Sequence, residues 1–147
     1  AEKITCTAVD PGKRVAAVAG YIIDTVSFSG HGSRLFGSKI HVVDIESKKE
    51  INSFECHPVE KNTKQEKGTK QVLDCMFLGN WRYLAAATGN KLILWDTERG
   101  QKQAEKQFED PIETAVLNFV RSDEGSFLIV KISKRKTYAY RIVRQTD

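Results

Sequence analysis

The sequence predicts an all-β fold built from consecutive antiparallel sheets of up to four strands each. Short runs of β-branched and apolar residues are separated by turn signals, as where residues 3–9 end at Asp10-Pro11-Gly12. Much of this pattern occurs twice, because residues 6–20 align with residues 75–89 without a gap at an offset of 69. Such a repeat indicates that the two copies fold into equivalent sheets.

The third strand of each copy reveals an insertion. Residues 39–44 align with residues 91–96 at an offset of 52, and both copies end shortly afterwards in Phe-Glu. Since the offset drops by 17, we expect an insertion at residues 21–37, between the second and third strands of the first copy.

A third and poorer copy follows Pro111. Residues 113–120, 126–132 and 137–142 are strand candidates, and the chain stops before a fourth strand. We therefore expect one unit over residues 1–147, with a first sheet at 1–57 that carries the 21–37 insertion, a second at 71–110 and an incomplete third at 111–147.

Three dipeptides carry a resemblance that covers nearly the whole chain. Trp95-Asp96 ends a strand before a tight turn, with Val43-Asp44 as its degenerate counterpart, and Cys56-His57 falls where a Gly-His pair would precede the next repeat. The pattern resembles the WD-repeat β-propeller family. The resemblance implies antiparallel four-stranded blades of a partial β-propeller, about two and three-quarter blades in all.

The chain also departs from that family. Gly89 stands at the position of the turn aspartate, and thirteen residues, 58–70, separate His57 from the strand that it should support. We therefore expect the family's His-Asp-Trp hydrogen-bond network not to be intact and Trp95 to be a packing residue.

A propeller ring needs about four to eight blades to close. We expect the ring to be completed by the rest of a longer propeller, by a partner, or by further copies of the chain. The absence of Met at Ala1 and the incomplete last blade favour the first explanation.

Composition limits the cellular setting. The chain has 147 residues, 40% hydrophobic and 29% charged, which is typical of a soluble globular protein, and no apolar run is long enough to span a membrane. The three cysteines, Cys6, Cys56 and Cys75, are widely spaced and odd in number, which favours reduced thiols and a cytoplasmic or nuclear location.

The side chains that could take part in catalysis or metal binding do not form a catalytic pattern. The segment 32–39 has the glycine spacing of a phosphate-binding loop, but its last two residues are Ser38-Lys39 in reversed order and a strand follows instead of a helix. The three histidines, His31, His41 and His57, have no sequence context of a triad, and the cysteines lack zinc-ligand spacing. We predict no enzymatic activity, no cofactor and no metal.

The 21–37 insertion is the main candidate for binding a partner. It is too apolar for a solvated loop, so it either folds back on the sheets or binds another protein, and it should emerge at the same end as residues 58–70. The candidate residues are Tyr21, Ile22, Ile23, Phe28, Arg34, Leu35 and Phe36. We predict a non-catalytic scaffold or adaptor that binds other protein subunits in a multiprotein complex.

The alternative is a component of an RNA-protein particle. The net charge is +4, and the basic excess lies after residue 120. Arginines that alternate with Tyr138 and Tyr140 could stack on bases and neutralise phosphates. The candidate contacts are Lys134, Arg135, Lys136, Arg141 and Arg144.

Overall fold

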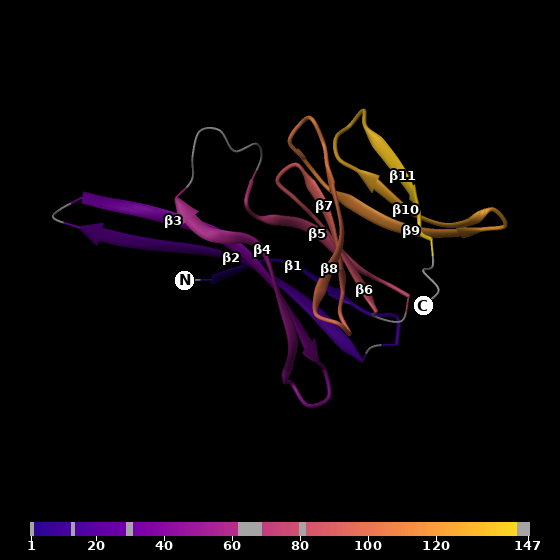
Figure 1. Cartoon of the computed structure of the whole chain (residues 1–147), viewed down its shortest axis with the longest axis horizontal. Helices are drawn as coiled ribbons and strands as arrows, with labels where there is room; N and C mark the ends of the chain where they lie inside the picture. Colours follow the sequence, from indigo (N-terminus) through magenta and orange to yellow (C-terminus); the bar gives the residue numbers. More distant parts are fainter. Residues whose placement is uncertain (1, 13, 29–30, 62–68, 80–81, 144–147) are drawn as a thin grey trace.

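The computed structural model describes residues 2–12, 14–28, 31–61, 69–79 and 82–143, which form three antiparallel sheets (Figure 1). The fold is all-β, as predicted, and the first two sheets each have the four strands expected of a blade. Sheet A contains β1 (Glu2–Val9), β2 (Val15–Phe28), β3 (His31–Asp44) and β4 (Glu50–Lys61) in that order. Sheet B contains β5 (Val72–Leu78), β6 (Tyr83–Thr88), β7 (Lys91–Asp96) and β8 (Gln101–Gln107). Sheet C contains β9 (Val116–Ser122), β10 (Gly125–Lys131) and β11 (Thr137–Arg141).

The described residues contain no helix, and therefore none that is long and apolar enough to cross a membrane.

The sheets are arranged side by side with B in the middle (Figure 1). The first strands β1, β5 and β9 are neighbours, and the backbone N–H of Leu117 in β9 donates to Asp74 Oδ2 in β5 over 2.8 Å. Each sheet is a simple meander, so its later strands lie progressively farther from this shared inner edge. This is the arrangement that propeller blades adopt.

Strands β5, β6 and β7 of sheet B contribute side chains to both faces of the sheet, which produces two separate cores. Leu84 and Ala86 of β6 pack toward sheet A, while Ala85 and Ala87 pack toward sheet C. Small side chains on β6 allow both neighbouring sheets to approach closely. Trp95 lies in the core between sheets A and B and is 3% exposed, so the prediction that it is a packing residue is confirmed.

The strand pairing corrects the predicted alignment of the repeat. Gly20 pairs with Lys39, and Thr88 pairs with Lys91 at the equivalent place in sheet B. The first two strands are therefore offset by 68 residues (88 − 20) and not by 69. The gapless match was wrong by one position because it followed the shared Ala-Ala and Gly letters, whereas ladder pairing decides which face a side chain occupies.

The same comparison fixes the length of the insertion. Eighteen residues separate Gly20 from Lys39, but only Gly89 and Asn90 separate the equivalent Thr88 and Lys91, so sixteen residues are inserted. Gly89 has φ +64°, and glycine at the first central position is what a tight two-residue hairpin turn of this kind requires.

The β3–β4 turn of sheet A and the β7–β8 turn of sheet B are held by the same kind of hydrogen bond. Asp44 Oδ2 accepts from the backbone N–H of Ser47 over 2.7 Å, and Asp96 Oδ1 accepts from two backbone N–H groups of its own turn over 3.0 and 3.1 Å. Each turn then contains one residue of positive φ, Lys48 at 61° and Gly100 at 67°. The aspartate that ends the third strand is therefore a cap for the following turn.

The inserted segment continues the sheet as a long hairpin. β2 and β3 remain paired as far as Phe28 and His31, and the hairpin projects from one end of the molecule (Figure 1). β4 follows it, with Leu35 opposite Lys61 and Phe36 opposite Glu60. Of the second insertion, residues 58–61 therefore belong to β4 and run beside the hairpin, while residues 62–68 lie outside the described residues.

Candidate functional site

The base of the β2–β3 hairpin presents apolar side chains on both of its faces. Ladder pairing places Tyr21, Ile23 and Phe36 on one face, with Ile22 and Leu35 on the other. The rings of Tyr21 and Phe36 stack with their centroids 6.1 Å apart and 17° between their planes. Tyr21 and Phe36 are half-buried, whereas Ile23 is 37% exposed. We refer to these five residues as the hairpin surface.

The other two predicted contact residues lie farther along the hairpin. Arg34 is exposed, and its backbone pairs with that of Thr25. Phe28 pairs with His31 through the backbone, but its side chain lies outside the described part of the structure.

Gly37 allows β4 to pack closely against the hairpin. A Cβ at this position would lie 2.9 Å from both the carbonyl oxygen of His57 and the Cα of Val59, which is closer than carbon atoms approach. The β3–β4 ladder changes register at the same place, between Phe36 and Ser38. β4 therefore bulges around Gly37 and continues alongside the hairpin.

A buried hydrogen-bond network joins this region to sheet B. Thr88 is fully buried, and its hydroxyl donates to the carbonyl oxygen of Gln71 over 2.7 Å. The Thr88 oxygen lies 3.0 Å from Nε2 of His57. Because a hydroxyl has a single proton, and Thr88 gives it to Gln71, the proton in the second bond belongs to His57 Nε2. Nε2 of His57 is therefore the protonated ring nitrogen in this network.

Burial keeps His57 neutral at physiological pH. Loss of solvation, together with the nearby charges of Lys91 and Lys70, lowers the pKa of His57 to about 4. A Cβ on Gly89 would lie 3.4 Å from His57 Cε1, so Gly89 faces this ring. His57 thus reaches sheet B through Thr88.

Sequence reasoning did not identify Thr88 as a partner of His57. The available signal was its position, since Thr88 is the only polar residue at the end of the otherwise apolar strand β6. The two residues are 31 positions apart and belong to different sheets, so the sequence alone does not reveal their contact.

His41 lies on the outer face of sheet A between two carboxylates. Its Nε2 is 2.8 Å from Glu2 Oε1, and its Nδ1 contacts Glu50. Partial burial disfavours protonation, but the hydrogen bonds that His41 donates to Glu2 and Glu50 outweigh it and raise the pKa of His41. This histidine therefore acts as the centre of a charged cluster on the sheet.

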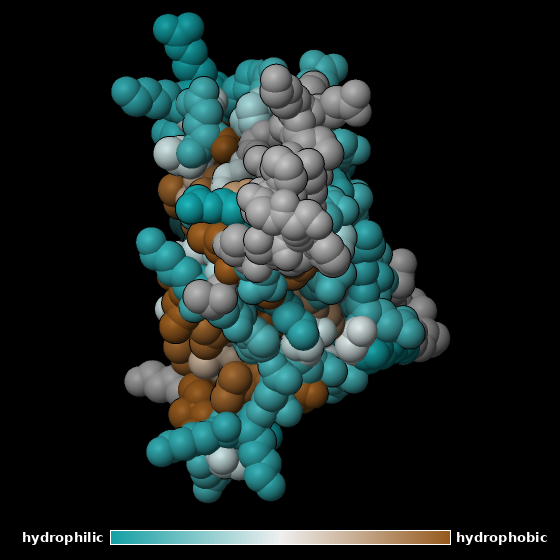
Figure 2. Space-filling model, turned by 90° about the vertical axis from the view of Figure 1, so that its left-hand side faces the viewer, coloured by the Kyte–Doolittle hydropathy of each residue, from teal (hydrophilic) through white to brown (hydrophobic). Residues whose placement is uncertain are grey.

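The two outer sheet faces also expose apolar side chains. On sheet A, Ile4 is 64% and Val9 is 55% exposed, and on sheet C, Val116 is 56% exposed. Figure 2 views the end that carries the hairpin and shows apolar surface gathered along one side of the molecule.

The basic residues near the C-terminus do not converge with the tyrosines. Tyr138 and Tyr140 stack on each other on the inner face of sheet C, where Tyr138 also lies 5.0 Å from the ring of Phe108. Arg141 is on the opposite face, over the ring of Phe127 at 5.7 Å. The predicted combination of aromatic stacking with arginine contacts is therefore divided between two faces.

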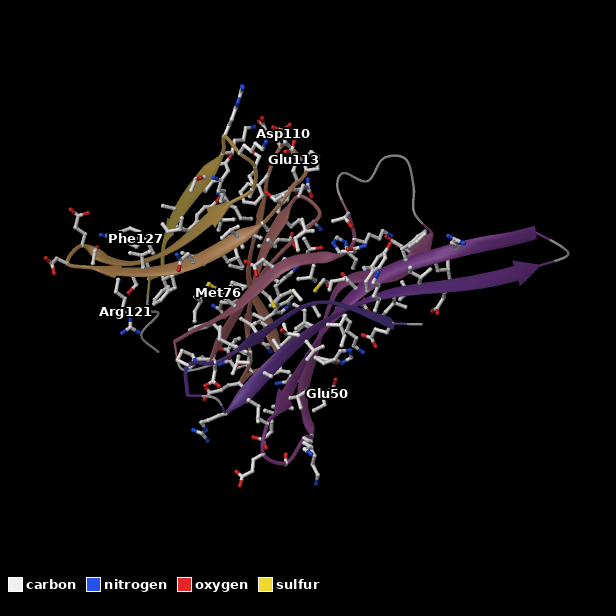
Figure 3. The ribbon with its side chains drawn as sticks, turned by 180° about the vertical axis from the view of Figure 1, so that it is seen from behind. Glu50, Met76, Asp110, Glu113, Arg121 and Phe127 are labelled. Atoms are coloured by element: carbon white, nitrogen blue, oxygen red, sulfur yellow. The ribbon has the colours of Figure 1, made fainter. Side chains whose placement is uncertain are left out.

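The remaining basic candidates lie elsewhere. Lys134, Arg135 and Lys136 are exposed in the β10–β11 turn, where Lys136 Nζ is 2.5 Å from Asp110 Oδ2. Figure 3 shows Asp110 well away from Phe127, and hence this turn well away from Arg141. Arg144 lies outside the described residues.

The structure also places the other residues considered for chemistry. Cys6, Cys56 and Cys75 are free thiols, as predicted. Residues 31–39 belong to strand β3. Across the described ranges, no three His, Cys, Asp or Glu side chains are grouped so as to hold a metal ion.

Comparison with models of known protein families gives no match to this chain, and comparison with curated protein sequences gives none either.

Proposed function

We propose that the protein is a non-catalytic scaffold or adaptor of the WD-repeat type, which uses the hairpin surface to bind another protein subunit in a cytoplasmic or nuclear complex. The observation that supports this most directly is a set of apolar side chains on a hairpin that projects beyond the sheets. Aromatic and aliphatic side chains on a projecting element are typical anchors of protein interfaces.

The backbone of the hairpin base favours binding with a small loss of entropy. Residues 20–23 pair with residues 36–39, and β4 adds a third strand beside this base. A binding segment that is already held in a sheet loses less conformational freedom on association than a loop does.

The outer sheet faces support assembly into a larger ring. Ile4, Val9 and Val116 would be covered if further sheets packed on sheets A and C as sheet B packs between them. We propose that these sheets come from the remainder of the same propeller or from other subunits, because three sheets are fewer than a closed ring contains.

The test is to shorten the hairpin in register. Gly20 pairs with Lys39 as Thr88 pairs with Lys91, so replacing residues 21–38 by Gly-Asn copies the turn that joins β6 to β7 and removes the hairpin surface. A milder variant combines Ile23→Ser with Arg34→Ala, both at exposed positions. Lys102→Ala, on the exposed strand β8, is the matched control.

Each variant would serve as bait in a cell extract, with retained proteins quantified by mass spectrometry and folding checked by circular dichroism. We expect a protein retained by the wild type and by Lys102→Ala to be lost from the shortened hairpin and reduced with the double variant. Equal retention by all four folded baits would refute the hairpin surface as the binding site.

A further inference from the structure

Two cysteines from different sheets are in direct contact at the inner edge of the molecule. Cys6 in β1 and Cys75 in β5 have their sulfur atoms 3.2 Å apart, and both thiols are free. A disulfide bond is about 2.05 Å long, so the two sulfurs lie within about 1.2 Å of bonding distance. The neighbouring positions of β1 and β5 bring the two thiols together.

The two thiols differ in their access to solvent. Cys75 is 4% exposed, whereas Cys6 is half-buried on β1, the first strand of sheet A. A dissolved oxidant therefore meets Cys6 first, and Cys75 is in a position to react with whatever forms on Cys6.

The local electrostatics also indicate that Cys6 reacts before Cys75. The hydrogen bond from Cys75 lowers the pKa of Cys6, because it stabilises a thiolate there. The same contact raises the pKa of Cys75. Cys56 lies in the same core, but burial raises its pKa to about 12 and keeps it protonated. The thiolate is the nucleophilic form of cysteine, so Cys6 is the reactive member.

We propose that Cys6 and Cys75 form a redox-active dithiol, which a peroxide converts into a disulfide that links sheet A to sheet B. The Cys6 thiolate attacks one peroxide oxygen, so that an S–O bond forms, the O–O bond breaks, and hydroxide leaves and is protonated to water. The Cys75 sulfur then attacks the Cys6 sulfenic acid; the S–S bond forms, the S–O bond breaks, and a second water leaves with the Cys75 proton. Two thiols are oxidised and one hydrogen peroxide is reduced to two waters.

The link would secure the sheet that carries the hairpin to the rest of the molecule. Its formation restricts the unfolded chain between two distant positions, so oxidation should raise the melting temperature by about 5–10 °C. This site does not depend on the proposed scaffold function, since it involves only the contact between β1 and β5.

The experiment treats the intact purified chain with hydrogen peroxide, blocks residual thiols with an alkylating reagent, and maps the products by peptide mass spectrometry. We expect a Cys6–Cys75 disulfide within one chain, an alkylated Cys56, and a rise in melting temperature that dithiothreitol reverses. Cys6→Ser should abolish the link and the rise, and the matched Cys56→Ser variant should retain both.

Mapping the wild-type product keeps the test decisive even if a serine variant folds poorly. A disulfide that includes Cys56, a link between two chains, over-oxidation of Cys6 without a link, or no reaction of the folded chain would each overturn the proposal.

Discussion

Replacing Thr88 by Val tests whether the network at the base of the hairpin stabilises the fold. Val has nearly the same shape as Thr, so the fully buried site keeps its packing and loses only the hydroxyl. The Gln71 carbonyl then lacks its 2.7 Å donor, and His57 Nε2 lacks its 3.0 Å acceptor. A buried polar group left without a partner costs about 1–3 kcal/mol, and His57 is partly accessible to water, so we expect a loss of about 2–4 kcal/mol.

Urea denaturation at pH 7.5, followed by tryptophan fluorescence, measures this loss as a lower midpoint with an unchanged slope. Thr88→Ser is the matched control, because it keeps the hydroxyl and removes one methyl group, at a cost of about 1 kcal/mol. If Thr88→Val lay within about 0.5 kcal/mol of the wild type, or if Ser were the more damaging change, the hydrogen bonds would not carry the stability assigned to them.

Three further predictions concern stability. The pKa of His57 falls to about 4 on folding, below its unfolded value of about 6.5, so its contribution is complete above pH 6.5 and is lost as pH falls toward 4. After a discount for partial exposure, the loss is about 1–2 kcal/mol in urea titrations, and a His57→Gln variant with the same pH dependence would contradict this. Lys48→Gly should stabilise the fold by about 1 kcal/mol and Gly100→Lys should destabilise it, because both positions have positive φ; melts that show the reverse order would refute this. Phe54→Ala should cost about 3–5 kcal/mol, since its ring stacks on Trp95 at 5.4 Å, and a cost below about 1 kcal/mol would exclude that contact as part of the core.

Local signals in the sequence predicted the parts of the fold that depend on neighbouring residues. Asp44 and Asp96 each accept a hydrogen bond from the residue three positions later, so their role as turn caps depends only on neighbouring residues. The alternation of strands and turns is likewise local. The register of the repeat is not a local property, because it depends on which residue lies opposite on the next strand. Alignment of identical residues therefore placed the two copies one residue out of register.

The hairpin was not predictable from local signals. Gly30, Gly32 and Ser33 give the segment the composition of a loop, yet Gly32 and Ser33 belong to β3 and pair with β2. The end of β4 adds pairing partners for Leu35 and Phe36 from more than twenty residues away. Long-range pairing of this kind overrides local propensity in sheets.

The division of the basic tail between two sheet faces is predictable from residue spacing. In a strand, residues an odd number of positions apart point to opposite faces. Tyr138 and Arg141 are three positions apart, so they could not have formed one stacking surface. The contacts of Cys6 with Cys75 and of His57 with Thr88, in contrast, join different sheets, and only the packing of whole blades brings them together.

The position of the hairpin surface follows from contacts outside the hairpin. Ser38 of β3 pairs with His57 of β4, and His57 is bonded to Thr88 in sheet B. Gly37, the residue before Ser38, has no Cβ and therefore allows β4 to bulge closely around it. The strand that carries Phe36 is therefore tied to the neighbouring sheet within two residues of that side chain, so a change that loosens the His57 network should also alter the orientation of the surface proposed to bind a partner.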